Sequence, residues 1–115
     1  MNVKWVKCSE TWCKFWDLDL LQDYFSDNNP AGVYVIWLGK DVLYVGQGDI
    51  KSRIEAHRKE YAFSRFHGQD VKITWCIVEV SLRDGIERYL ADLYKPRLGQ
   101  SHPNVISIPV NLLNE

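Results

Sequence analysis

Five side chains in this sequence have the chemical types that hydrolysis of a phosphodiester bond requires. They are Tyr34, Tyr44, Arg53, His57 and Glu87. The reaction needs an activated water, a cation for the developing negative charge and help for the leaving oxygen. A carboxylate can hold Mg²⁺ if waters and the phosphate complete the octahedron, and a guanidinium can bind two phosphate oxygens. A tyrosine beside a cation loses its proton more easily than its ordinary pKa of about 10 suggests.

The first two of these residues flank a predicted β-hairpin. The run GVYVIWLGKDVLYVGQG, residues 32–48, contains two β-rich stretches around a turn at 39–41. A three-residue loop would pair Ile36 with Tyr44 and place Tyr34 diagonally on the same face, within about 7–8 Å. A two-residue loop would separate the tyrosines. A shared site therefore requires an odd-length loop or a β-bulge.

Two predicted helices carry the other three residues. Asp49 is a candidate N-cap for a helix that runs to about Tyr61. Its expected buried stripe is Ile50, Ile54, His57 and Tyr61. Arg53 and His57 are four residues apart and share a face. The later helix opens with a capping box at 81–84 and ends at Pro96. Its expected stripe is Leu82, Ile86, Leu90 and Leu93, and Glu87 lies on the flank of that stripe, facing a cleft.

The remaining segments complete a small α+β fold. We expect a short strand at Val3–Cys8, a helix at about Trp12–Phe25 and a strand at Val71–Val80. The chain then forms a single domain, 1–115. Residues 1–30 are an N-terminal extension, 31–98 a core and 99–115 an extended tail. The predicted sheet is small and mainly antiparallel, a hairpin plus a third strand, and helices flank it.

Charge is distributed unevenly along the chain. The net charge of −1 argues mildly against tight nucleic-acid binding. Basic residues gather in the middle, at Lys51, Arg53, Arg58, Lys59, Arg65 and Lys72. Acidic residues gather early, at Glu10, Asp17, Asp19, Asp23 and Asp27. A basic middle region can therefore face a nucleic acid while the acidic start faces away.

Cysteine usage and hydropathy indicate in which cellular compartment the protein is expected. Three cysteines, Cys8, Cys13 and Cys76, are expected to be reduced thiols, because their number is odd and their spacing is not that of a zinc site. The start of the sequence lacks the apolar run of a signal peptide, and no stretch approaches the roughly 20 apolar residues that span a bilayer. We therefore expect a cytoplasmic protein with no membrane partner.

The order and spacing of the motifs resemble the GIY-YIG nuclease family. Gly32-Val33-Tyr34 and Tyr44-Val45-Gly46 are followed by an arginine, a histidine and a glutamate at the family's positions. The resemblance extends from Gly32 to about Pro96, which is most of the chain. The central residue of both motifs is valine where the family name has isoleucine.

The resemblance implies a role for each site residue. Tyr34 would be the general base and Tyr44 would orient the water. Arg53 would contact the scissile phosphate, His57 would be a secondary site residue, and Glu87 would hold Mg²⁺ or Mn²⁺. The family also carries a late asparagine. Gly99 occupies a position where many members have it, so Asn111 is the candidate and Asn104 the alternative. Further substrate-binding candidates are Gly46, Gln47 and Lys51.

Structural interpretations compete with these roles. The tyrosines suit a half-buried strand, Arg53 suits a solvated surface, and His57 suits a packed core as well as a catalytic site. Three functions follow. The first is a DNA endonuclease whose specificity comes from a protein partner or from self-association. The second is a non-catalytic nucleic-acid- or protein-binding module that retains the nuclease fold. The third is an unrelated domain that docks a partner through its tryptophan-rich start, Trp5 to Trp16.

Overall fold

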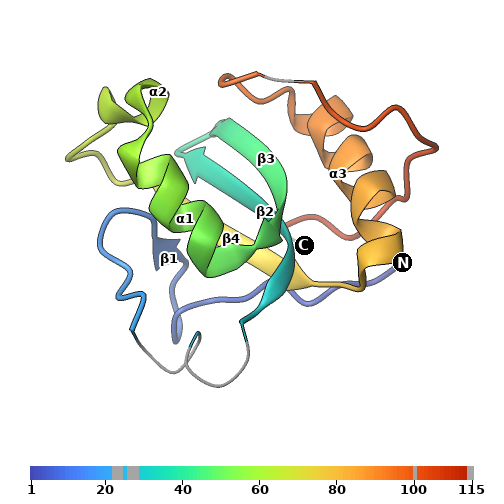
Figure 1. Cartoon of the computed structure of the whole chain (residues 1–115), viewed down its shortest axis with the longest axis horizontal. Coiled ribbons are helices and arrows are strands. Elements are labelled where there is room, and N and C mark those ends of the chain that lie inside the picture. Colours follow the sequence, from blue (N-terminus) through green and yellow to red (C-terminus); the bar gives the residue numbers. More distant parts are fainter. Residues whose placement is uncertain (22–24, 26–28, 100, 114–115) are drawn as a thin grey trace.

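The computed structural model describes residues 1–21, 25, 29–99 and 101–113 of an α+β fold (Figure 1). The elements, in chain order, are β1 (Cys13–Lys14), β2 (Ala31–Leu38), β3 (Asp41–Asp49), α1 (Ile50–Lys59), α2 (Tyr61–Ser64), β4 (Lys72–Ile77) and α3 (Val80–Tyr94). The strands form one antiparallel sheet in the order β1-β4-β2-β3. The expected small antiparallel sheet flanked by helices is confirmed.

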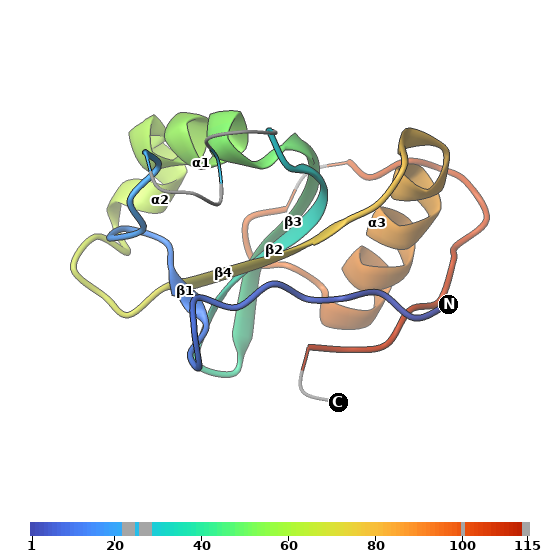
Figure 2. The same cartoon turned by 90° about the horizontal axis from the view of Figure 1, so that it is seen from below.

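Helices cover both faces of this sheet (Figure 2). Because side chains alternate along a strand, β2 sends Tyr34 and Ile36 to one face and Val33 and Val35 to the other. The first face packs against α1 and α2, and the second packs against α3. Strand β3 forms one edge of the sheet and contacts both α1 and α3. Groups from two opposite faces can therefore meet only around this edge strand.

A β-bulge in β3 places Tyr34 and Tyr44 on the same face. The turn has two residues, Gly39 and Lys40, so the three-residue loop is wrong. Ile36 nevertheless pairs with Tyr44, as expected, because the register shifts at the next pair of the ladder. The alternative of a bulge is confirmed. The two tyrosine rings stack with their centroids 6.0 Å apart.

The two main helices begin where the sequence indicated, but details differ. The Asp49 carboxylate accepts a hydrogen bond from the Ser52 amide at 2.9 Å, which confirms the N-cap of α1. The helix stops at Lys59, so Tyr61 is 93% exposed, and Phe63 of α2 is buried in the α1-side core instead.

Helix α3 differs from its prediction at both ends. It begins at Val80 after Glu79, which makes no side-chain capping bond, so the capping box at 81–84 is wrong. Leu93 shares the stripe of Ile86 but lies in the last turn of the helix, where it is 47% exposed. The helix ends at Tyr94, close to the predicted stop at Pro96.

The N-terminal predictions fail because backbone groups are bonded across the fold. Residues 3–7 are extended beside β4 without forming a strand, and the Val6 amide donates to the Trp75 carbonyl at 2.9 Å. The helix expected at 12–25 is absent from its described residues, 12–21 and 25. The Phe15 amide pairs with the Val71 carbonyl instead, and the Arg58 guanidinium binds the carbonyls of Phe15 and Leu18. A helix would need those carbonyls for itself.

Two of the three cysteines are joined, which corrects the expectation of reduced thiols. Cys8 and Cys13 form a disulfide that closes the loop before β1. Cys76 is a free, buried thiol, and burial raises its pKa to about 11. The sequence spacing gave no signal for the bond, because proximity depends on the turn between the two residues.

The C-terminal segment is an extended strap across α3. The Ile108 amide donates to the Gly85 carbonyl at 2.9 Å, and a Cβ at Gly85 would lie 2.5 Å from the Ile108 side chain. Close packing of this segment against α3 therefore explains a glycine inside the helix. None of the helices in the described part of the chain is long and apolar enough to cross a membrane.

Candidate functional site

Three of the predicted site residues form a continuous hydrogen-bonded chain on the α1 side of the sheet. The Tyr34 hydroxyl lies 2.7 Å from His57 Nε2, and Arg53 Nε donates to the same hydroxyl at 3.3 Å. Tyr34 and His57 are each 1% exposed, whereas Arg53 is half-buried. Strand β2 and the helical i, i+4 spacing on α1 bring these groups together. Tyr44 packs against the His57 ring, with centroids 4.5 Å apart.

The protonation of this chain follows from burial. Burial lowers the pKa of His57, and the positive charge of Arg53 acts in the same direction, while nearby Glu60 opposes both. A neutral His57 accepts a hydrogen bond from the Tyr34 hydroxyl at Nε2 and carries its own hydrogen on Nδ1. Nδ1 lies 3.1 Å from Glu60 Oε1 but is too poorly aligned to form a hydrogen bond, so it is buried without a partner. Tyr34 therefore donates to His57 and accepts from Arg53.

Burial also raises the pKa of both tyrosines above the ordinary value of 10. The Arg53 guanidinium lowers each pKa, but for both residues burial is the larger effect. The neighbouring cation thus eases deprotonation of each phenol, as expected, but burial outweighs it in the protein alone. At neutral pH both hydroxyls keep their protons, so Tyr34 can pass a proton along the chain but is not a standing base.

Two glycines of β3 shape the space beside the hydroxyls. A Cβ at Gly46 would lie 2.5 Å from the Tyr34 hydroxyl oxygen and 2.7 Å from the Tyr44 ring. Gly48 has a φ of +132°, and the Arg53 stem runs 3.5 Å from where its Cβ would stand. Gly46 was a candidate for substrate binding, but the two tyrosines fill the space in which its side chain would stand.

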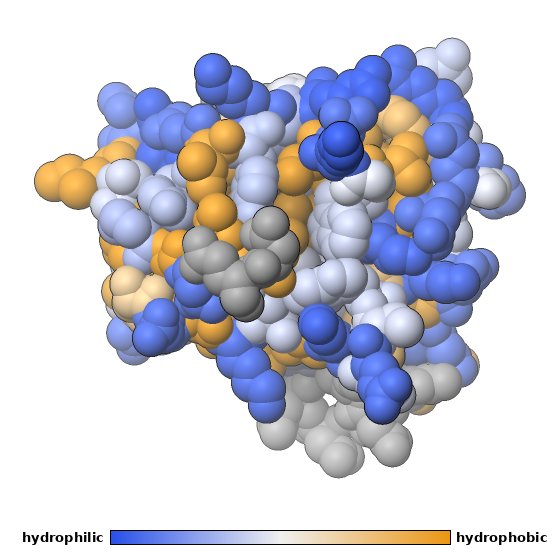
Figure 3. Space-filling view, turned by 180° about the vertical axis from the view of Figure 1, so that it is seen from behind, coloured by the Kyte–Doolittle hydropathy of each residue, from blue (hydrophilic) through white to orange (hydrophobic). Residues whose placement is uncertain are grey.

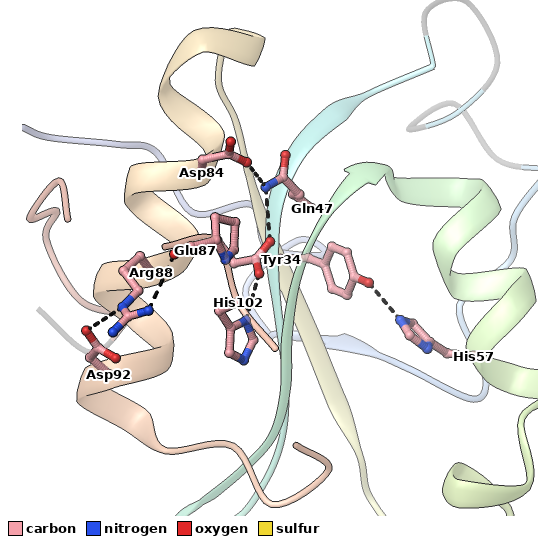
Figure 4. Close-up of polar contacts among 9 residues, drawn as sticks. Tyr34, Gln47, His57, Asp84, Glu87, Arg88, Asp92 and His102 are labelled. Atoms are coloured by element: carbon pink, nitrogen blue, oxygen red, sulfur yellow. Dashed lines mark hydrogen bonds and ion pairs between the residues drawn. The ribbon is translucent and has the colours of Figure 1, made fainter. Parts of the chain in front are cut away.

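Glu87 projects from α3 on the other side of β3 (Figure 4). It is 5% exposed. Its Oε1 accepts from Gln47 Nε2 at 3.1 Å, and its Oε2 lies 2.7 Å from His102 Nδ1. The Gln47 amide also donates to Asp84 at 2.7 Å. The carboxylate therefore lies buried in a polar setting, and Gln47 ties it to the edge strand.

The predicted residues thus form two groups, one on each side of β3. Tyr34 points toward His57 and α1, while Glu87 reaches toward Gln47 from α3 (Figure 4). The groups are electrostatically coupled, because the Glu87 charge is among the smaller causes that raise the pKa of Tyr34 and Tyr44. A substrate that contacts both groups would have to cross the edge strand at residues 46–48.

The asparagine and lysine candidates are not part of the two groups on either side of β3. Both ends of the Asn111 side chain bond the backbone of Val3. Its Oδ1 accepts from the Val3 amide at 2.6 Å, and its Nδ2 donates to the Val3 carbonyl at 3.0 Å. Asn111 is therefore used to attach the N-terminal segment. Asn104 is exposed, and Lys51 is half-exposed at the start of α1.

His102 is the site residue that the sequence did not indicate. It lies in the C-terminal segment, where no periodicity predicts its direction, and it pairs with Glu87. Arg88 holds this segment through a 3.5 Å bond to the Pro103 carbonyl and is itself paired with Asp92. A histidine followed by proline in a polar tail gives no signal of such a contact.

The residues at Glu87 fit a divalent ion held by a single protein carboxylate. No group of three or more His, Cys, Asp or Glu side chains able to hold a metal occurs among the described residues. Each Glu87 oxygen accepts one hydrogen bond and keeps another lone pair. Mg²⁺ commonly binds through one or two carboxylates and completes its shell with waters and phosphate. The donor set therefore suits Mg²⁺ better than a softer metal.

Searches of protein-family models, curated proteins and solved structures return no match to this chain. The assignment of function therefore depends on the residues and their geometry.

Proposed function

We propose that this chain is a divalent-metal-dependent endonuclease that hydrolyses DNA phosphodiester bonds, as its resemblance to GIY-YIG nucleases implies. The observation that carries the proposal is the hydrogen-bonded chain of Arg53, Tyr34 and His57 at the edge strand, with Glu87 across that strand. These are the residue types the reaction needs, and all four are buried or half-buried around a stretch of β3 where Gly46 and Gly48 carry no side chain.

The geometry supports a relay for the proton of the attacking water. The water gives its proton to the Tyr34 oxygen while the Tyr34 proton passes to His57 Nε2, 2.7 Å away. The Arg53 guanidinium donates to Tyr34 through Nε and also hydrogen-bonds Tyr44, and another of its five N–H groups would bind a non-bridging phosphate oxygen. A divalent ion bound at Glu87 supplies Lewis-acid stabilisation of the developing charge. Tyr44 keeps His57 oriented by packing on its ring.

Charge and size suggest how the substrate is selected. The basic residues on and after α1 offer a local positive region despite the net charge of −1. The described fold has no second domain that could read a sequence, so a protein partner or self-association would supply target choice. RNA cleavage is the alternative that the same chemistry permits.

Nicking of supercoiled plasmid by the purified protein with Mg²⁺ or Mn²⁺ tests the proposal. We expect nicking that EDTA abolishes and that Glu87→Ala and Arg53→Ala reduce by at least about 10²–10³-fold. Asp84→Asn is the matched control, because Asp84 shares Gln47 with Glu87 but lies one turn away and is exposed. Activity that survives in Glu87→Ala would contradict the assigned site.

A non-catalytic DNA-binding module is the second candidate. This candidate is favoured because both Glu87 oxygens already have hydrogen-bond partners and because both tyrosines, whose pKa is raised, keep their protons. This candidate predicts no nicking under any metal, together with binding that weakens steeply with salt. Nicking that tracks the variants above would remove it.

A further inference from the structure

A cavity of about 380 Å³ lies at the turn of the hairpin, apart from the residues of the candidate site. Its size is in the range of sites that bind small organic groups. Four separate segments build it, and the lining residues that matter here are Trp12, Trp37, Lys40, Val42, Tyr94 and Leu113. Val42 and Trp37 belong to the α3 side of the sheet, the side of Glu87. On the face opposite to that of Figure 1, hydrophobic patches surface among hydrophilic atoms (Figure 3).

The wall of this cavity is aromatic and contains an unused hydrogen-bond donor. Trp12 packs edge-to-face on Trp37, with centroids 6.0 Å apart and planes at 82°. The indole nitrogen of Trp37 is buried and has no hydrogen-bond partner among the described residues. Buried polar groups are normally paired, so an unpaired one on a residue that lines a cavity calls for an explanation. Because the atom itself is buried, a ligand acceptor would pair it only after the lining side chains shift.

The charge around the aromatic rings is positive. Lys40 lines the cavity, and the Lys7 ammonium lies 4.6 Å from the centre of the Trp12 ring. Both lysines are exposed, so their charges face the solvent beside the cavity mouth. Flat rings with cations at their rim match a planar group attached to an anion, which is the chemistry of a nucleotide.

The cavity is placed within reach of a strand bound at Glu87. Tyr94 lies two helical turns after Glu87 on α3, about 10 Å along the axis and on the same side of the helix. That distance corresponds to about three nucleotides of a stacked strand. An aromatic cavity this close to the cutting site would engage a base only if that base had left the stack.

We propose that the cavity binds one unstacked nucleobase, so that the substrate class is DNA with an unpaired nucleotide near the cut. The position of the cut rests on the proposed nuclease function, whereas binding of the base does not. Trp12 and Tyr94 provide stacking surfaces, Trp37 donates to a base acceptor, and Lys40 contacts the attached phosphate. The cavity would thus supply the selectivity that the described fold otherwise lacks.

Equilibrium binding to two labelled DNAs tests this proposal. One is a fully paired duplex and the other is the same duplex with a short single-stranded overhang. The protein is the full chain carrying Glu87→Ala, in EDTA, so that cleavage and metal play no part. Trp37→Phe and Trp12→Ala are added separately, and Lys40→Ala serves if either fails to fold. Tyr61→Ala is the matched control, because it removes an aromatic ring that is 93% exposed and distant from the cavity.

We expect at least about tenfold tighter binding to the overhang DNA, with most of that preference lost in the cavity variants and kept in Tyr61→Ala. An unchanged preference in both tryptophan variants would overturn the proposal. So would a cavity that binds a proline-rich peptide, another ligand of aromatic grooves, and ignores DNA. Retained preference in a protein that never nicks plasmid would remove the nuclease function and leave the base-binding site standing.

Discussion

The two sides of strand β3 are built in different ways. On the α1 side, Tyr34, Tyr44 and His57 are packed among aromatic rings and come from one short stretch of chain. On the α3 side, Glu87 is held by polar contacts to Gln47 and to His102 in the C-terminal segment. The first group is fixed mainly by packing. The second is fixed mainly by hydrogen bonds.

This difference suggests a division of labour. Packing holds the α1 group in a dry setting where burial keeps the tyrosines protonated and His57 neutral, which suits the transfer of a proton. Hydrogen bonds to a carboxylate can be exchanged for a cation or a water without rebuilding the core. The α3 group therefore suits the binding of charge.

The largest expected effect is the loss of the Tyr34 hydroxyl. Tyr34→Phe keeps the ring but breaks the link between Arg53 and His57, and we expect the nicking rate to fall by about 10²–10⁴-fold. Tyr44→Phe is the comparison and should lose less, since its ring contact with His57 remains. Plasmid nicking at matched fold content, checked by circular dichroism, measures both. Equal, small losses would mean that the α1 side does not handle the proton.

Adding one methyl group should distinguish the two sides by stability. Gly46→Ala places a Cβ 2.5 Å from the Tyr34 hydroxyl, within packed rings, and should reduce the free energy of unfolding by about 1–3 kcal/mol. Gly85→Ala places a Cβ 2.5 Å from Ile108 Cγ1 and 3.1 Å from the Ile106 carbonyl oxygen, so the C-terminal segment would have to shift. The gain of roughly 1 kcal/mol in helix propensity should offset part of this cost, so the net loss of stability should be smaller than for Gly46→Ala. Urea unfolding compares the two, and equal costs would contradict the contrast.

Removal of the histidine beside Glu87 should affect metal binding more than folding. His102→Ala takes away a contact of 2.7 Å, and we expect the metal concentration for half-maximal nicking to rise about 10–100-fold. His102→Asn, which keeps an N–H donor, should recover part of it. His67→Ala is the control, since His67 packs on Trp16 instead. An unchanged metal dependence in His102→Ala would show that this contact is incidental.

The smallest effect expected is the dependence of stability on pH. Burial lowers the pKa of His57 below its ordinary value of 6.5, so between the two values only the unfolded chain binds the proton. The contribution of a neutral His57 to the free energy of unfolding is fully present above about pH 6.5. It is lost as the pH falls toward the pKa of His57 in the folded protein. We expect lower stability at pH 5 than at pH 7, and a flatter profile in His57→Gln. The charged groups that bear on this ring are Glu60 and Arg53, and Tyr34 and Tyr44 face it from the sheet. Identical profiles would contradict a neutral, buried His57.

Local patterns in the sequence predicted the elements that carry the α1 side. Alternation predicted the hairpin, and the Asp49 cap predicted the start of α1. The spacing of Arg53 and His57 predicted a shared helix face. The length of the turn was wrong, yet the tyrosines still share a face, because the bulge replaced the missing loop residue.

The α3 side depended on contacts that no local pattern contains. His102 reaches Glu87 from an irregular segment, and Asn111 is occupied by Val3, which is 108 residues away in the chain. The expected helix at 12–25 failed for the same reason, since Arg58 and β4 claim the backbone groups of that stretch.

The sequence by itself determined the types of the reactive groups, the hairpin, both main helices and the face that each catalytic candidate occupies on its own element. These follow from interactions between residues a few positions apart, which strand alternation and helical spacing express directly. Only the tertiary structure decided the ionisation of the tyrosines, the pairing of Glu87 with His102 and the separation of the candidates by β3. Those depend on burial and on contacts between distant segments, and both arise only when the whole chain packs.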